Sequence, residues 1–294
     1  MASEAAIAKG KVGVVGAGLM GAEIALIYAL AGYDVLLADR SAGELDVAVA
    51  RLDTILQKGV GRGFYQPQDT APTLRRIRTT TDLAKFADRD MVTEAVFEEE
   101  TVKAEIFRSL DKILPPDTLI ASNTSSIAIS TLAAHVAPSR RPQFLGTHYF
   151  SPVSRMRLVE VIPQFETSES AVERAMAYCR DAGKTPIRVR DVVGFAVNRV
   201  LHAFVIEAIK LVEEGVATPE DIDLACKLGL GHPIGPFELM DVTTSKLCLQ
   251  VQEILHDAYG ERFRPPALLK QRVNAGYLGR KAGKGWLRSA ERKT

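Results

Sequence analysis

A histidine and a glutamate twelve residues apart have the chemistry of a proton-transfer pair. His148 follows the apolar segment 144–147, and Glu160 lies inside a second apolar segment, residues 158–162. If the chain between them turns back as a hairpin, Glu160 returns beside His148, where a carboxylate fixes the imidazole tautomer and stabilises its protonated form. The pair would then act as a base toward a hydroxyl group. Two plainer interpretations stay open: the histidine bonds to a backbone carbonyl, and the glutamate faces solvent.

Three glycines near the start of the chain have the spacing of a turn that holds a pyrophosphate. Gly16, Gly18 and Gly21 follow the apolar segment 12–15 and precede a predicted helix over residues 22–31. Gly16 permits a tight turn, Gly18 lets the backbone approach a phosphate, and Gly21 lets the helix pack closely on the sheet. The helix N-terminus presents unpaired N–H groups and a positive dipole end to the phosphates.

An aspartate at the end of the second predicted strand completes this dinucleotide-binding pattern. Asp39 follows segment 33–38 and lies 18 residues beyond Gly21, where a carboxylate accepts hydrogen bonds from the adenosine ribose. It would repel a 2′-phosphate, so the predicted cofactor is NAD rather than NADP, although Arg40 could partly offset that repulsion. With NAD beside His148, a hydride would pass from an alcohol to the cofactor while His148 takes the hydroxyl proton.

Further polar residues lie where strands end or helices begin. Residues 122–126, all small and polar, follow a buried strand and offer donors at the sheet edge, or they cap a predicted helix over 127–135. Asn198 heads a long apolar helix, where a capping role is the plainer interpretation. Glu98 and Lys103 flank a helix start, where a solvated charge pair is the plainer interpretation.

Composition bounds the class of protein. The 294 residues are 47% hydrophobic with a net charge of +1, which suits one large or two medium globular domains and does not favour nucleic acid or an anionic membrane as a partner. No apolar run reaches membrane-spanning length. The three cysteines are widely spaced, and no histidine has metal-ligand spacing, so no disulfide framework and no metal site are expected. Residues 1–5 and 291–294 carry no targeting pattern, which predicts a cytoplasmic location.

The order of predicted elements indicates two domains. Residues 11–162 alternate strand and helix, as in a Rossmann-type α/β domain with a parallel sheet. From residue 194 the pattern is helical, so we expect a dinucleotide-binding domain over 1–190 and an all-helical domain over 191–294. The helix over 198–214 is apolar around most of its circumference and must be buried by its own domain or by another subunit. Residues 59–72 are expected to form a polar, glycine-containing connection.

Together these motifs resemble the short-chain L-3-hydroxyacyl-CoA dehydrogenase family, including bacterial 3-hydroxybutyryl-CoA dehydrogenases. The resemblance covers nearly the whole chain. It rests on residues 16–21 (GAGLMG), 122–126 (SNTSS), 148–152 (HYFSP), 158–160 (LVE), 194–199 (GFAVNR), 231–239 (GHPIGPFEL) and 278–285 (LGRKAGKG). Ser151 stands where many members have Asn, and Val193 where a Pro is usual.

The resemblance implies reversible, NAD-dependent oxidation of an L-3-hydroxyacyl-CoA in fatty-acid β-oxidation. His148 resembles the family's catalytic base and Glu160 its partner. Ser125 resembles the serine that bonds to the reacting oxygen, and Asn198 the asparagine near the thioester. The cofactor-binding positions implied are Gly16, Gly18, Leu19, Met20, Gly21, Asp39, Glu98, Lys103, Ser125, Ser151 and Lys281. The family fold implies a homodimer formed mainly by the helical domain, with acyl-CoA in the cleft between the domains.

Two other functions remain open on the sequence. One is a dehydrogenase of a free 3-hydroxy acid, and the other is an NAD-binding homologue without activity. A group of basic residues favours a CoA-sized anion, although a solvated face explains it equally well: Lys58, Arg62, Arg75 and Arg76. The presence of Ser125, His148, Glu160 and Asn198 together argues against an inactive protein.

Overall fold

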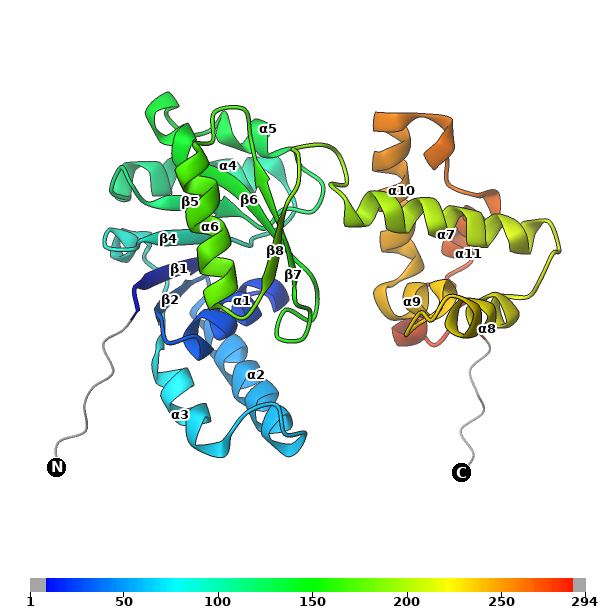
Figure 1. Ribbon diagram of the computed structural model, residues 1–294, viewed down its shortest axis with the longest axis horizontal. Coiled ribbons are helices and arrows are strands. Elements are labelled where there is room, and N and C mark those ends of the chain that lie inside the picture. The colour runs from blue at the N-terminus through cyan, green and yellow to red at the C-terminus, as the bar shows by residue number, and fades with distance from the viewer. Residues whose placement is uncertain (1–8, 288–294) are drawn as a thin grey trace. The chain divides into compact units, whose positions relative to one another are not determined.

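The computed structural model describes residues 9–287 and divides the chain into two compact units at Val192 and Val193 (Figure 1). We call them the N-terminal unit and the C-terminal unit. The terminal segments from which a cytoplasmic location was predicted lie outside the described residues. Within residues 9–287, no helix combines the length and the apolar character needed to cross a bilayer.

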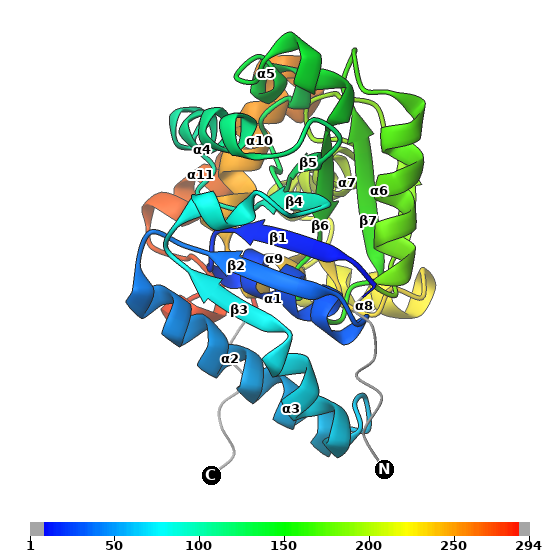
Figure 2. The same ribbon diagram turned by 90° about the vertical axis from the view of Figure 1, so that its left-hand side faces the viewer.

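An eight-stranded sheet in the order β3-β2-β1-β4-β5-β6-β7-β8 forms the centre of the N-terminal unit (Figure 2). Every neighbouring pair is parallel except β6 and β7, which are antiparallel. The strands are β1 (Lys11–Val15), β2 (Asp34–Ala38), β3 (Ile77–Thr80), β4 (Met91–Glu94), β5 (Leu119–Ser122), β6 (Phe144–Tyr149), β7 (Leu158–Pro163) and β8 (Thr185–Arg188). Strands β4, β5 and β6 are buried along their whole length, including the polar residues near their carboxyl ends, Glu94, Ser122 and His148.

Helices cover both faces of this sheet. They are α1 (Leu19–Leu30), α2 (Ala42–Gly61), α3 (Pro67–Arg75), α4 (Glu100–Ile113), α5 (Ile129–Ala133) and α6 (Glu169–Asp181), with short 3₁₀ turns η1 (Leu83–Phe86) and η2 (Pro138–Gln143). Leu145 shares one core with residues of α1 and α6, whereas Phe144 packs against Phe107 of α4. Successive strand residues point to opposite faces, so α4 covers the face toward which His148 also points.

The C-terminal unit is built from helices. They are α7 (Val197–Glu213), α8 (Pro219–Gly229), α9 (Pro236–Thr243), α10 (Ser245–Tyr259) and α11 (Ala267–Asn274), with 3₁₀ turns η3 (Glu261–Phe263) and η4 (Arg280–Ala282). Val205, Phe237, Leu269 and Trp286 belong to its main core. The predicted fold class, a Rossmann-type domain followed by a helical domain, is confirmed.

Two elements differ from the sequence-based expectation. The stretch expected as a polar connection contains the end of α2 and the first six residues of α3, which begins at Pro67 and encloses a second proline, Pro72. Strand β8 was not predicted, because it lies at the sheet edge with three of its four residues exposed and shows no apolar periodicity. Helix α7 leaves Val200 71% exposed, so its own unit does not cover its whole apolar surface.

Candidate active site

The antiparallel register of β6 and β7 places His148 directly opposite Glu160. Opposed residues project their side chains to the same face of the sheet, and Nδ1 of His148 lies 2.8 Å from a carboxylate oxygen of Glu160. Both side chains are buried. The predicted hairpin is therefore confirmed, and the interpretation of Glu160 as a solvent-facing residue is wrong.

Ser125 adds a third side chain to this pair. Its Oγ lies 3.0 Å from Nε2 of His148, so the two ring nitrogens contact two different residues. Because an ionised carboxylate only accepts hydrogen bonds, Glu160 favours the tautomer with the proton on Nδ1, and the lone pair on Nε2 then faces Ser125. Three residues far apart in the sequence thus form one hydrogen-bonded chain at the carboxyl ends of β5 and β6.

Glu98 fixes the turn that carries Ser125. One carboxylate oxygen accepts hydrogen bonds from the backbone N–H groups of Ser125 and Ser126, each at 2.8 Å, and from Oγ1 of Thr124 at 2.6 Å. Burial raises the pKa of Glu98, but the charge of Lys103 and these hydrogen bonds outweigh it and hold the pKa below its ordinary value. Helix α5 has Ala128 at its N-cap, so the polar run does not supply that cap.

Lys103 is buried in the first half of α4 and is 1% exposed. Its Nζ lies 2.7 Å from Glu94 and 3.3 Å from Glu98, so the interpretation of a solvated charge pair is wrong. Glu94 was missed in the sequence. It is fully buried at the end of β4 and also accepts hydrogen bonds from Ser122 Oγ at 2.6 Å and from Val96 N–H at 2.7 Å. A carboxylate within an apolar strand pattern, the signal that pointed to Glu160, could have identified it.

The glycine turn has the geometry that its sequence predicts. Gly16 has φ +105°, and a Cβ there would lie 2.6 Å from the carbonyl oxygen of Ala95. A Cβ on Gly21 would collide with the carbonyl of Gly16, whereas a Cβ on Gly18 would meet no atom within 4 Å. The backbone at Gly18 therefore borders open space at the start of α1, as close approach to a phosphate requires.

Next to the glycine turn, the site includes Asp39 and a cavity that Asp39 lines. The Asp39 carboxylate accepts hydrogen bonds from the N–H groups of Ala17 at 2.8 Å and Ser41 at 3.2 Å. It lines a cavity of about 670 Å³. Other lining residues are Gly16, Gly18, Leu19, Met20, Arg40, Ala95, Val96, Phe97, Val102 and Ile106. An acceptor beside an open glycine turn fits the adenosine half of a dinucleotide.

Arg51 of α2 forms hydrogen bonds to the backbone of the glycine turn. The sequence did not indicate this contact. Arg51 donates hydrogen bonds to the carbonyl oxygens of Ala17 and Gly18 at 3.0 and 2.9 Å. Those carbonyl groups are thereby held on the α2 side. The turn's shape is thus fixed by side-chain contacts as well as by its glycines.

Three predicted site residues lie apart from these contacts. Ser151 is exposed in the loop between β6 and β7. Asn198 is the second residue of α7, whose N-cap is Ala196, so the capping interpretation is wrong. Lys281 is exposed in η4. The roles of these residues toward cofactor and substrate remain predictions.

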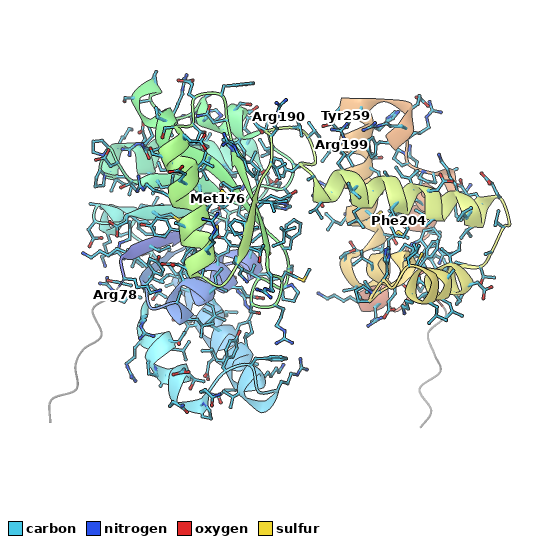
Figure 3. The ribbon with its side chains drawn as sticks, viewed as in Figure 1. Arg78, Met176, Arg190, Arg199, Phe204 and Tyr259 are labelled. Carbon is cyan, nitrogen blue, oxygen red and sulfur yellow. The ribbon has the colours of Figure 1, made fainter. Side chains whose placement is uncertain are left out.

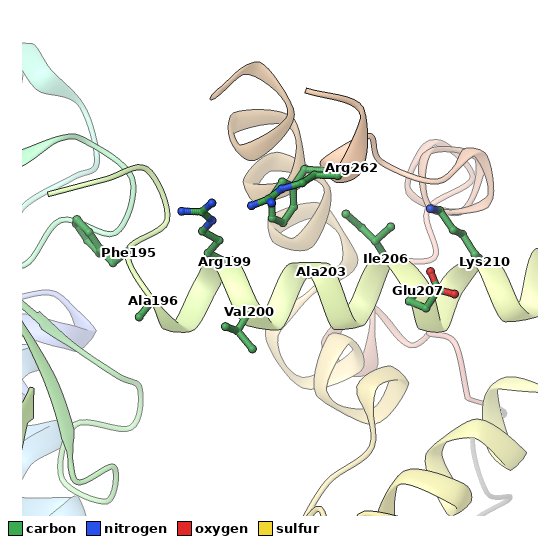
Figure 4. Close-up of a pocket in the computed structure, with 10 residues that line it drawn as sticks. Phe195, Ala196, Arg199, Val200, Ala203, Ile206, Glu207, Lys210 and Arg262 are labelled. Carbon is green, nitrogen blue, oxygen red and sulfur yellow. The ribbon is translucent and has the colours of Figure 1, made fainter. Parts of the chain in front are cut away.

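The C-terminal unit has a cavity of its own, about 560 Å³, along α7 and η3 (Figure 4). Arg199, Glu207, Lys210 and Arg262 contribute its charged groups. Arg199 also lies over the ring of Tyr259 at 4.1 Å from its centroid (Figure 3). Among residues 9–287, no group of three or more histidine, cysteine or acidic side chains is arranged to hold a metal ion.

A mainly parallel sheet, an open glycine turn with its aspartate and a buried histidine–glutamate pair define an NAD-dependent oxidoreductase of the Rossmann type. Comparison with known proteins identifies the particular family. The family described as 3-hydroxyacyl-CoA dehydrogenase, NAD binding domain, matches residues 11–192, and the corresponding C-terminal domain matches residues 194–289. The chain belongs to the 3-hydroxyacyl-CoA dehydrogenase family.

Individual relatives match over almost their full length. A probable 3-hydroxybutyryl-CoA dehydrogenase of Deinococcus radiodurans is 42% identical over 280 residues, covering 94% of this chain and 99% of the relative. The mitochondrial hydroxyacyl-coenzyme A dehydrogenase of Sus scrofa is 38% identical, covering 93% and 89%. The crystal structure of (S)-3-hydroxybutyryl-CoA dehydrogenase from Ralstonia eutropha superimposes with a TM-score of 0.91 at 38% identity, covering 96% and 99%.

Proposed function

We propose that this protein interconverts an L-3-hydroxyacyl-CoA and the 3-ketoacyl-CoA with NAD, a reaction of fatty-acid β-oxidation, and that His148 is its general base. The observation that carries the proposal is the buried chain Glu160–His148–Ser125, with contacts of 2.8 and 3.0 Å. It lies at the sheet edge that also bears the glycine turn. Family membership supports the substrate class.

Each side chain of the site has its own role in the oxidation. Bound NAD supplies the acceptor for the hydride that leaves C3 of the substrate. The substrate hydroxyl group donates a hydrogen bond to Nε2 of His148, and Ser125 Oγ orients its oxygen. As the carbonyl forms, the hydroxyl proton passes to Nε2, and the Glu160 carboxylate stabilises the resulting imidazolium. In the reverse direction, the same imidazolium returns the proton to the forming alcohol.

Short acyl chains on CoA are the proposed substrates, because several relatives are described as 3-hydroxybutyryl-CoA dehydrogenases. Exposed cations support an anionic carrier: Lys58 and Arg62 lie at the end of α2, and Arg155 stacks over the ring of Phe64 at 3.3 Å. Arg76 contributes less, since its guanidinium donates to the carbonyl of Ala29.

The proposal assigns a task to each domain. Residues 1–190 bind NAD, and residues 191–294 bind substrate and form a homodimer, with Asn198 near the thioester and Lys281 near the cofactor. Exposed apolar side chains of the C-terminal unit support an association surface: Val200 is 71% exposed, Leu228 79% and Leu230 63%. Light scattering should give twice the 32.0 kDa chain mass; a fully active monomer would contradict the dimer. Three free, buried cysteines support a reducing compartment such as the cytoplasm.

The test is NADH absorbance with acetoacetyl-CoA, longer 3-ketoacyl-CoAs and, in the direction of oxidation, free 3-hydroxybutyrate. We expect turnover of the CoA thioesters and a kcat/KM for NADH well above that for NADPH, because of Asp39. Turnover of the free acid alone would identify the protein as a dehydrogenase of a free 3-hydroxy acid. Cofactor binding without any turnover would identify an inactive NAD-binding protein.

A further inference from the structure

Two carboxylates share one ammonium group in the N-terminal unit. Lys103 contacts Glu94 at 2.7 Å and Glu98 at 3.3 Å, and we call these three residues the acid cluster. Both oxygens of Glu94 receive donors only: Lys103 and Val96 N–H on one, and Ser122 Oγ on the other. Donors on both oxygens suit an ionised carboxylate, so the cluster keeps one negative charge that Lys103 does not neutralise.

The net charge of the cluster is only partly in water, because Glu94 is buried whereas the Glu98 side chain is 37% exposed, and charge removed from water is expensive unless something uses it. Glu94 is fully buried and Lys103 is 1% exposed, and ion pairs removed from water bring little net stability. A structural bridge between β4, β5 and α4 would need only a neutral pair. The second carboxylate, Glu98, makes the cluster anionic.

The sheet order fixes where that charge lies. Strands β4 and β5 lie between β1, which leads into the glycine turn, and β6, which carries His148 near its carboxyl end. Parallel strands present their carboxyl ends at one edge, so a dinucleotide reaching from the glycine turn to His148 passes the ends of β4 and β5. The cluster contacts both ends of this path. It bonds to Val96, which lines the cavity beside Asp39, and Glu98 bonds to the N–H of Ser125.

We propose that the acid cluster shifts cofactor binding toward the oxidised form, because its two carboxylates outnumber the one ammonium group of Lys103. The oxidised nicotinamide ring is a cation and the reduced ring is neutral, while the rest of the cofactor is the same. A net negative charge beside the ring therefore attracts only the oxidised form. The inference rests on the proposed function through the placement of the hydride acceptor near His148.

The experiment measures binding without substrate. NADH affinity is titrated by its own fluorescence, and NAD affinity by displacement of NADH. In Glu94→Gln we expect the preference for NAD over NADH to fall about 30-fold, as for loss of one charge about 8 Å away at an effective dielectric constant near 20. In Lys103→Met, which makes the cluster more negative, we expect the opposite shift. The double variant Glu94→Gln/Lys103→Met restores the original charge and should restore the original ratio.

Two controls separate charge from structure. Ser122→Ala removes a hydrogen bond to Glu94 without changing charge and should leave the ratio unaltered, and affinity for ADP-ribose, which has no nicotinamide, should not respond to Glu94→Gln. If Glu94→Gln and Lys103→Met move the ratio in the same direction, or leave it unchanged, the proposal is wrong. Should Glu94→Gln fail to fold, Glu98→Gln at the more exposed end of the cluster must lower the preference instead.

This outcome is independent of the substrate. A protein that binds both cofactors with the expected charge dependence, yet reduces no 3-ketoacyl-CoA, would retain the electrostatic role of the cluster and lose the proposed activity. Normal turnover with an invariant NAD to NADH ratio would retain the activity and refute the role.

Discussion

Four buried carboxylates, two in each unit, differ in their partners. In the C-terminal unit, Asp223 accepts the N–H groups of Phe237 and Glu238 at the start of α9, and Asp241 accepts those of Trp286 and Leu287. These partners are all backbone groups. In the N-terminal unit, Glu160 contacts the imidazole of His148, and Glu94 contacts the ammonium of Lys103.

The kind of hydrogen-bond partner indicates the role of a buried acidic side chain. A backbone N–H cannot gain or lose a proton, so an acid that receives two of them fixes the chain in place and offers no chemistry. An imidazole or ammonium group changes the charge around it when it reacts or is replaced. The comparison predicts that acids with side-chain partners affect turnover or cofactor preference, whereas acids with backbone partners affect stability alone.

The largest effect is expected from His148→Gln. We expect kcat to fall at least about 100-fold, the usual minimum for loss of a general base. The dissociation constant for NAD should stay within about twofold, because His148, in contact with Glu160 and Ser125, serves the reacting carbon and not the adenosine half of the cofactor. Steady-state rates give kcat, and displacement of fluorescent NADH gives the dissociation constant for NAD. An NAD affinity that fell in parallel with kcat would place His148 among cofactor-binding residues.

Glu160→Gln tests the functional side of the comparison more directly. The amide keeps the shape but not the charge that stabilises the imidazolium, so we expect kcat to fall about 30-fold. Combined with His148→Gln it should cause little further loss, because two residues that act as one unit are not additive. Unchanged kcat in Glu160→Gln would return Glu160 to a purely structural role.

The sequence allowed prediction of the site where local pattern decides geometry. Two apolar segments joined by an eight-residue connection indicate a hairpin, and the register of that hairpin brings Glu160 opposite His148. The glycine turn is specified in the same way, because its conformation depends on missing side chains.

The rest depends on tertiary packing. Lys103 looks like any helix-surface lysine until β4 and β5 bring Glu94 and Ser122 beside it. Arg51 lies 33 residues from the carbonyl of Gly18 that it holds, and its own segment gives no sign of that contact. Edge strand β8 leaves no apolar pattern to find.

The structural side of the comparison is tested by Asp241→Asn. The amide can accept from only one of the two N–H groups now held at 2.8 and 3.1 Å. One buried N–H is then left facing an amide hydrogen, which should lower the free energy of unfolding by about 1–2 kcal/mol. Urea unfolding measures the loss, and kcat should stay within about twofold at a temperature where the variant is folded. A large fall in kcat with unchanged stability would contradict the prediction that acids with backbone partners affect stability alone.

His202 extends the comparison to a buried base. It lies in α7 of the C-terminal unit, and burial lowers its pKa from 6.5 to about 4. Its nearest polar partner is the Cys248 thiol, with 3.9 Å between Nδ1 and Sγ. Because the unfolded chain takes up this proton at a higher pH than the folded one, His202 makes folding less favourable as the pH falls from about 6.5 toward 4. Between pH 7 and 5.5, its share of the loss is about 1 kcal/mol.

The variant His202→Gln isolates that share, because glutamine does not titrate. Urea unfolding of both proteins at pH 7 and 5.5 gives the difference in slope, from which all other titrating groups cancel. We expect the variant to lose about 1 kcal/mol less than the parent over this interval. Equal losses in the two proteins would show that His202 is protonated alike in the folded and unfolded chain. A histidine whose proton uptake is linked to folding, and not to turnover, would place this buried base on the structural side of the comparison with Asp241.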